Sequence, residues 1–230
     1  MIANIFVTLG LAAGAAFLFV KTQTKKEKLP LMSVASGLTL KAKMKSINDL
    51  YGSVLASEAN RINIPVSSAA AILAVESSGR GFGNDGQLLI RFEPKVFKDR
   101  SGQDISYSHK NNAAEHQTFN NALALDNGKY KVDAYKSISM GIGQIMGFNA
   151  TRIGYTNAEQ MYAVFAQALE PQIVGVFKFI ETDKTLLNAA RTDDFAAFAK
   201  KYNGSGYAAN KYDVKLADAK AAFVASTGLV

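Results

Sequence analysis

An apolar helical run that ends at a single carboxylic acid is the feature that most constrains this chain. Residues 69–75 are all Ala, Ile, Leu or Val, and Glu76 follows them, before the glycine-rich sequence Ser-Ser-Gly-Arg-Gly. The helix keeps water from one side of Glu76, and the loop admits a ligand from the other. Partial desolvation raises a carboxyl pKa, as a general acid near neutral pH requires. The alternative is an ordinary helix end with a solvated acid and Gly79 just beyond it.

The amino-terminal stretch predicts a transmembrane anchor over residues 1–20. Residues 2–20 carry no charge, and as a helix they would span about 28 Å, close to the roughly 30 Å hydrocarbon core of a bilayer. A cleaved signal peptide is the competing interpretation, but no Lys or Arg precedes the run and no small-residue cleavage site follows it. Gly10 and Gly14 form a GxxxG pair that can support self-association through this helix.

The positive charge of the chain belongs to a basic linker over residues 21–45. Residues 1–45 contain seven lysines and one acid, which leaves 19 basic and 18 acidic residues in the predicted domain, residues 46–230. A nearly neutral domain argues against nucleic-acid binding. Lysines next to a membrane segment favour anionic lipid as their partner.

The residue types that usually bind metals are scarce. The chain contains no cysteine and two histidines, His109 and His116. Both histidines lie in polar sequence, so we expect them at the surface. The composition therefore argues against a thiolate or histidine-rich metal site.

The pattern around the acidic helix predicts a helical domain. Apolar residues recur at helical spacing from Ser46, a plausible N-cap, to Ile62. Pro65 ends this helix, and Ser67 can cap the next one, which carries Glu76.

A short strand is predicted over residues 87–93, after a turn at residues 84–86. Its alternation puts Leu88, Ile90 and Phe92 on one face. Glu93 provides a second acid soon after Glu76, and its alternative role is a surface ion pair with Arg91.

The remaining elements are mostly helical. Residues 99–116 read as a polar loop. Helices are predicted over residues 119–125, 132–138, 158–182 with a break at Pro171, 193–202 and 212–225.

A glycine-rich apolar stretch, Ser139 to Asn149, indicates either a ligand against the main chain or a tightly packed turn. Gln144 and Asn149 are its polar members, and their amides suit recognition of hydroxyl and amide groups. Tyr202 and Asn203 stand beside Gly204, where they would either line a cleft or pack on the domain edge.

Four motifs in order resemble a known family. They are Ala74 to Phe82, Ile90 to Glu93, Ser139 to Asn149 and Tyr202 to Tyr207. Their order is similar to that of the lysozyme-like superfamily of peptidoglycan-cleaving enzymes, and most of all to the N-acetylmuramidase domain of bacteriophage endolysins. The likeness covers about residues 46–226.

The resemblance implies a mainly α, lysozyme-like α+β domain with a small β-hairpin. It implies Glu76 as the catalytic acid and Glu93 at the second acidic position, with Gln144, Tyr202 and Asn203 along the sugar cleft. Two departures are visible. Pro94-Lys95 replaces a common Arg-His, and Met140 replaces a Trp that commonly stacks on sugar.

The predicted function is a membrane-anchored muramidase that cuts the β-1,4 bond after N-acetylmuramic acid in peptidoglycan. This reaction needs no cofactor or metal. A lytic transglycosylase, which needs one acid and forms an anhydro product, is the alternative within the superfamily. A non-catalytic peptidoglycan-binding virion or membrane component is the alternative from another class.

The place of the domain relative to the membrane stays open. The lysines follow the anchor, and the positive-inside tendency would leave the domain in the cytoplasm, away from the cell wall. Either the anchor leaves the host inner membrane, as in signal-arrest-release lysins, or it sits in a phage virion's internal membrane.

Overall fold

The computed structural model describes residues 37–77 and 79–230. The predicted anchor over residues 1–20, with its GxxxG pair, and the linker up to residue 36 lie outside the described residues. Within the described ranges, no helix has the length and hydrophobicity that crossing a bilayer requires.

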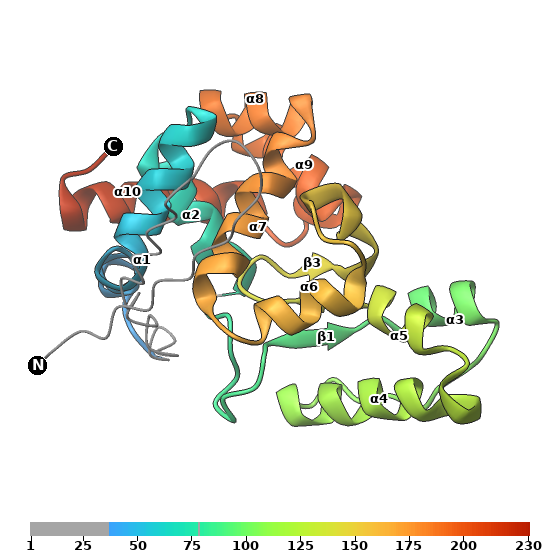
Figure 1. The fold of residues 1–230 in the computed structure, drawn as a ribbon. Helices are drawn as coiled ribbons and strands as arrows, with labels where there is room; N and C mark the ends of the chain where they lie inside the picture. Colours follow the sequence, from blue (N-terminus) through green and yellow to red (C-terminus); the bar gives the residue numbers. More distant parts are fainter. Residues whose placement is uncertain (1–36, 78) are drawn as a thin grey trace, which may run out of the picture.

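The elements, in order (Figure 1), are α1 (Leu40–Ile62), α2 (Val66–Ser77), β1 (Ile90–Phe92), α3 (Pro94–Ser101), α4 (Asn112–Ala124), η1 (Leu125–Gly128), α5 (Lys131–Lys136), β2 (Ile138–Met140), β3 (Ile145–Met146), η2 (Gly147–Asn149), η3 (Thr151–Ile153), α6 (Ala158–Phe165), α7 (Leu169–Glu181), α8 (Lys184–Thr192), α9 (Phe195–Asn203), η4 (Ser205–Tyr207) and α10 (Tyr212–Thr227).

The fold is mainly helical with one small antiparallel sheet, as predicted. Helices α1, α2, α8, α9 and α10 gather on one side of α7, and the sheet with α3, α4 and α5 lies on the other (Figure 1). Helix α2 runs through the core, where it packs against both α1 and α10. Residues 67–73 are at most 1% exposed, which is why this helix can be apolar on every face.

The first helix begins earlier than predicted. Ser46, the predicted N-cap, lies inside α1, which begins at Leu40 and is capped by Thr39, whose Oγ1 accepts from the Ala42 N–H at 3.3 Å. Met44 is fully buried. The last residues of the predicted linker therefore belong to the folded domain.

The predicted cap of α2 is also wrong. Pro65 does separate the two helices, but its own carbonyl accepts from Ser68 and Ala69 and opens α2. Ser67 is fully buried inside the helix, and within the described residues its Oγ has no hydrogen-bond partner. A hydroxyl that faces the core cannot reach the free N–H groups at the helix start.

The sheet has the strand order β1-β2-β3. Arg91 pairs with Ser139, and Met140 pairs with Ile145. The predicted strand over residues 87–93 is shorter than expected, but its alternation is confirmed, because Leu88, Ile90 and Phe92 are at most 3% exposed while Arg91 is exposed. The predicted turn at residues 84–86 is confirmed as well.

Several helix limits differ from the prediction. The loop over residues 99–116 is shorter, because α3 reaches Ser101 and α4 begins after Asn111, whose side chain accepts from the Ala114 N–H. The break in the later helix falls at residues 166–168, and Pro171 sits in the first turn of α7, where its missing N–H is tolerated. Ile138 belongs to a strand, and α8 was not predicted.

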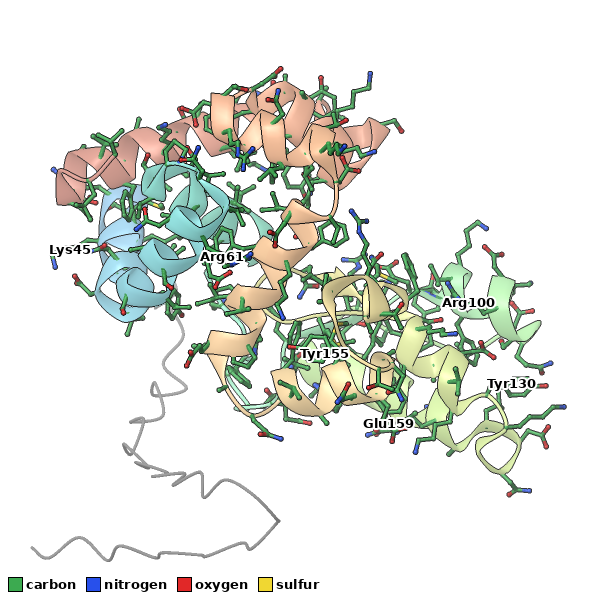
Figure 2. The ribbon with its side chains drawn as sticks, turned by 45° about the horizontal axis from the view of Figure 1, so that its top comes forward. Lys45, Arg61, Arg100, Tyr130, Tyr155 and Glu159 are labelled. Atoms are coloured by element: carbon green, nitrogen blue, oxygen red, sulfur yellow. The ribbon has the colours of Figure 1, made fainter. Side chains whose placement is uncertain are left out.

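Polar links join α1 to the later helices. Near the end of α1, Arg61 lies against α7 (Figure 2), and its guanidinium pairs with Glu58 at 2.8 Å and with Glu181 at 2.6 Å. From α8, Arg191 donates two hydrogen bonds to the carbonyl of Ile62. These contacts fix the carboxyl end of α1, although the exposed pair with Glu181 contributes little stability.

Candidate active site

The end of α2 places Glu76 where the core meets the glycine-rich segment at residues 79–81, which we call the glycine loop. Glu76 is the penultimate residue of α2, and Ala74, two residues earlier, is still only 7% exposed. Gly79 has a left-handed φ of 73° and donates its N–H to the Leu73 carbonyl at 3.3 Å. The helix therefore stops abruptly after its acidic residue, as the sequence predicts.

Tyr51, from α1, holds the loop that follows Glu76. Its hydroxyl donates to the Gly79 carbonyl at 3.0 Å, and its side chain is 2% exposed. Burial raises the pKa of Tyr51 to about 12, so the hydroxyl keeps its proton at any physiological pH.

A buried glutamine joins the two glycine-rich motifs. Gln172 of α7 is fully buried, accepts from the Ile142 N–H at 2.9 Å and donates to the Phe165 carbonyl at 2.8 Å. A Cβ at Gly81 would lie 2.1 Å from Gln172 Oε1, and one at Gly141 would lie 2.8 Å from it. Both motifs therefore need glycine because their backbones press against the same side chain.

The other glycines of the second motif are equally confined. A Cβ at Gly143 would lie 2.2 Å from Val176 Cγ2, and one at Gly147 would lie 1.9 Å from the Tyr135 carbonyl oxygen. The sequence of residues 139–149 indicated either a ligand against the main chain or a tightly packed turn, and the structure shows the tightly packed turn.

Gln144 stands at the end of that turn. Its φ is 46°, its Oε1 accepts from the Ser139 hydroxyl at 3.0 Å, and its Nε2 donates to the Gly141 carbonyl at 2.9 Å. These bonds fix the amide and leave the second Nε2 hydrogen available for another acceptor.

Tyr202 and Asn203 support the same turn from α9. The Tyr202 hydroxyl donates to the Gly143 carbonyl at 2.9 Å, and its ring stacks on Phe198. Asn203 follows at the end of α9, with its Oδ1 shielded from solvent. The structure therefore brings Tyr202 to the Gln144 turn, as the motif order suggests.

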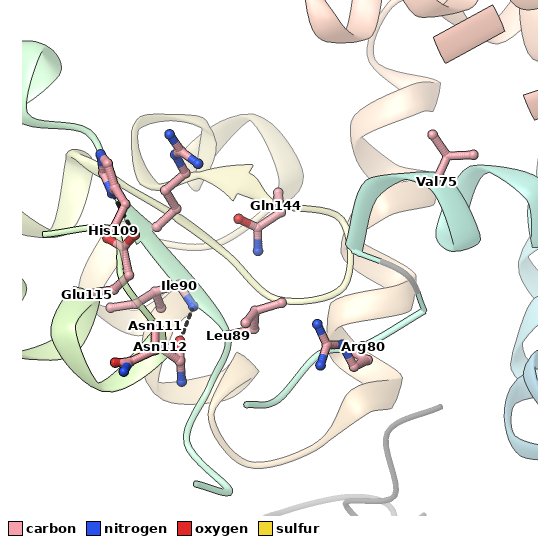
Figure 3. Close-up of a pocket in the computed structure, with 10 residues that line it drawn as sticks. Val75, Arg80, Leu89, Ile90, His109, Asn111, Asn112, Glu115 and Gln144 are labelled. Carbon is pink, nitrogen blue, oxygen red and sulfur yellow. Dashed lines mark hydrogen bonds and ion pairs between the residues drawn. The ribbon is translucent and has the colours of Figure 1, made fainter. Parts of the chain in front are cut away.

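A groove of about 340 Å³ lies between the end of α2, the glycine loop, β1, α4 and this turn (Figure 3). Its lining residues are Val75, Arg80, Leu89, Ile90, Arg91, His109, Asn111, Asn112, Glu115 and Gln144. Val75 directly precedes Glu76, so the groove opens at the acidic end of α2. Guanidinium and amide groups dominate its polar wall, which suits a ligand rich in oxygen acceptors.

Glu93 and Asn149 lie outside the lining of this groove. The Glu93 carboxylate is 3.3 Å from Arg91 Nε and about one-third exposed, so the predicted Arg–Glu pair is present. Glu93 also precedes the first residue of α3. Asn149 ends η2, where it is partly exposed. Among the predicted site residues whose side chains the structure describes, Gln144 is thus the one that lines the groove.

The sequence did not predict the part of the groove wall built by α4. Glu115 is 6% exposed, and its Oε2 accepts from the Phe92 N–H at 2.8 Å. Its Oε1 lies 2.7 Å from Nδ1 of His109, which lines the groove with a side chain that is 31% exposed. The expectation of a surface histidine holds only in part for His109.

The same helix covers the free edge of β1. Asn112 Oδ1 accepts from the Ile90 N–H at 3.1 Å, and His116 Nε2 lies 2.8 Å from the Leu88 carbonyl. His116 is 5% exposed, so its prediction as a surface residue is wrong. An edge strand needs partners for its backbone groups, and polar side chains of α4 supply them.

The sequence model of the N-acetylmuramidase family matches residues 65–224. The chain belongs to the N-acetylmuramidase family. The crystal structure of a Burkholderia AP3 phage endolysin is similar to this muramidase, with 27% sequence identity and a TM-score of 0.67. The likeness covers 76% of this chain and 70% of the endolysin. No curated protein matches the chain.

These findings confirm the resemblance seen in the four motifs. The muramidase is a glycoside hydrolase of the lysozyme type that acts on peptidoglycan. The family match includes every residue of the groove but begins after α1. Helix α1, through Tyr51, is therefore a support for the glycine loop from outside the matched region.

Proposed function

We propose that this muramidase cleaves the β-1,4 bond between N-acetylmuramic acid and N-acetylglucosamine, with Glu76 as the general acid. The observation that carries the proposal is the position of Glu76 at the end of a buried apolar helix. Val75, the residue before Glu76, lines the groove. Glu76 gives its proton to the leaving oxygen as the glycosidic bond breaks. Water adds its hydroxyl to the anomeric carbon, so the net reaction consumes one water.

The other site residues have proposed roles in binding and in water activation. Glu93 takes the proton from the attacking water or stabilises the oxocarbenium-like transition state. The free Nε2 hydrogen of Gln144 donates to the glycan, and Tyr202 keeps the Gln144 turn in place. Asn149 and Asn203 contribute amides that bind the glycan.

A lytic transglycosylase is the second candidate, and one observation favours it. The Glu93 carboxylate pairs with Arg91 and lies outside the groove lining, and a transglycosylase needs no second acid. In that reaction the C6 hydroxyl of the muramic acid replaces water as the nucleophile.

We expect digestion of purified peptidoglycan to yield reducing-end N-acetylmuramic acid. Mass spectrometry of the products distinguishes the two reactions, because the reducing and the 1,6-anhydro products differ by one water. A predominantly anhydro product would reassign the enzyme as a transglycosylase and leave Glu93 with a structural role.

We further propose that residues 1–20 anchor the enzyme in a membrane, followed by a basic linker. Nineteen uncharged residues suffice to span a bilayer. The full chain is expected to float with lipid in a density gradient and to resist extraction by carbonate. A chain that begins at Gly37, and so keeps the Thr39 cap and Met44, is expected to be soluble and lytic.

Two outcomes would revise this proposal. Release of the full chain by salt alone would mean that only the lysines bind the lipid surface. Recovery of a mature form that lacks residues 1–20 would identify a cleaved signal. Detection of the protein in purified virions or in the host inner membrane decides which membrane holds it.

A further inference from the structure

An aromatic pair lies at the end of the groove that is distant from α2. Figure 3 shows His109 and Glu115 at one end of the groove and Val75 at the other. The ring centroid of Tyr107 is 5.1 Å from that of His109, and the two planes are tilted by 51°. Tyr107 is 54% exposed. A large part of the tyrosine ring is therefore open to solvent beside the groove.

Glu115 fixes this pair to the sheet. Burying a carboxylate is unfavourable unless its oxygens are hydrogen-bonded. The two oxygens of Glu115 meet the Phe92 N–H and Nδ1 of His109. A carboxylate oxygen accepts hydrogen bonds, so this contact suits the His109 tautomer that carries its proton on Nδ1. A series of contacts thus runs from β1 through Glu115 and His109 to Tyr107.

Few other exposed aromatic rings are available for ligand contact. The chain contains no tryptophan. Among the described residues, the exposed large aromatic side chains are Tyr107 and Phe148. Arg100 lies over the Phe148 ring, 5.2 Å from its centroid. Tyr107 is thus the exposed aromatic ring that adjoins a residue of the groove wall.

We propose that Tyr107 stacks on a sugar ring of the glycan strand and forms a subsite at this end of the groove. The proposal rests on the proposed function, because the ligand is the same glycan. A pyranose ring has a face of C–H groups, which an exposed tyrosine ring can cover at low entropic cost. His109 and Glu115 are positioning residues, because they hold the tyrosine ring in place.

The subsite makes affinity depend on the length of the glycan. A short oligosaccharide bound beside Glu76 leaves Tyr107 uncovered, whereas a longer one reaches it. We therefore expect Tyr107→Ala to weaken binding of long oligosaccharides roughly tenfold and to leave binding of short ones unchanged. Tyr107→Phe keeps the ring and is expected to retain most of the affinity.

The test measures dissociation constants by calorimetry for the full chain carrying Glu76→Gln, so that turnover does not consume the ligand. The ligands are purified peptidoglycan oligosaccharides of two and of six sugars. The control is Val214→Ala, at an exposed apolar residue of α10. Unchanged affinity of Tyr107→Ala for the longer ligand, or an equal loss for both lengths, would overturn the subsite.

The positioning role is tested with Glu115→Gln and His109→Ala. Both are expected to weaken binding of the longer ligand less than Tyr107→Ala does. The ring ¹⁵N shifts of His109 are expected to report a protonated Nδ1 in the parent and a change of tautomer in Glu115→Gln. Full affinity in His109→Ala would remove the positioning role. If the parent binds neither ligand, the proposed function fails and this inference fails with it.

Discussion

Glu76→Gln is expected to abolish peptidoglycan cleavage while the protein stays folded. The amide has nearly the same size as the carboxyl group but cannot transfer a proton to the leaving oxygen. Loss of a general acid typically lowers the rate about 10²- to 10⁴-fold. A turbidity assay on purified peptidoglycan measures the effect, and circular dichroism checks the fold.

The matched control is Glu159→Gln. Glu159 is an exposed residue of α6 that pairs with Lys131, so the same chemical change there should leave the rate unaltered. Near-normal activity of a folded Glu76→Gln protein would remove Glu76 from the catalytic role, whatever the family match.

Gly81→Ala is expected to lower the free energy of unfolding by about 2–3 kcal/mol and to reduce activity with it. The new methyl group would lie 2.1 Å from Gln172 Oε1 and 2.3 Å from Leu169 Cδ2. Neither side chain can yield easily, because Gln172 is fully buried and Leu169 is 1% exposed. For a domain of this size, the loss corresponds to a fall in Tm of roughly 4–12 °C.

Gly206→Ala provides the comparison for this effect. A Cβ at Gly206 meets no atom within 4 Å, so this variant should unfold at the wild-type temperature. Thermal unfolding of both variants measures the two Tm values, and their comparison tests the prediction. If Gly81→Ala unfolds within the error of the wild type, Gln172 does not confine the glycine loop.

The parts of the site that depend on local sequence could be predicted. A continuous apolar run rich in alanine favours a buried helix, so α2 and its end just after Glu76 could be expected from residues 69–79. The glycines at positions 141, 143 and 147 predicted a close approach of the backbone to other parts of the protein, and each of them lies against another segment. Sequence order alone, however, does not reveal that Gln172 is the common neighbour of Gly81 and Gly141.

The helix starts were wrong because capping depends on backbone conformation. Ser46 and Ser67 are suitable caps by residue type, but both lie within helices, and Thr39 and Pro65 open those helices. The apolar pattern before Ser46 is sparse, so the sequence offered no reason to extend α1 to Leu40.

The α4 wall of the groove could not be predicted from residue patterns. Glu115 and His116 bond to backbone atoms of Phe92 and Leu88, which lie more than twenty positions earlier in the chain. Such pairing depends on where α4 docks against β1. Without that geometry, a polar segment with two histidines is indistinguishable from a solvated loop.

The packing of α2 between α1 and α10 has a consequence for synthesis of the enzyme. Helix α10 spans Tyr212–Thr227, far along the chain from α2, so the ribosome must synthesise every residue up to α10 before α2 is enclosed. Until then, the apolar surface around Ile72 and Leu73 has no permanent cover and is open to chaperones and proteases. We therefore expect cleavage activity to appear only after α10 has been synthesised, and a nascent chain that stops before Tyr212 to be degraded.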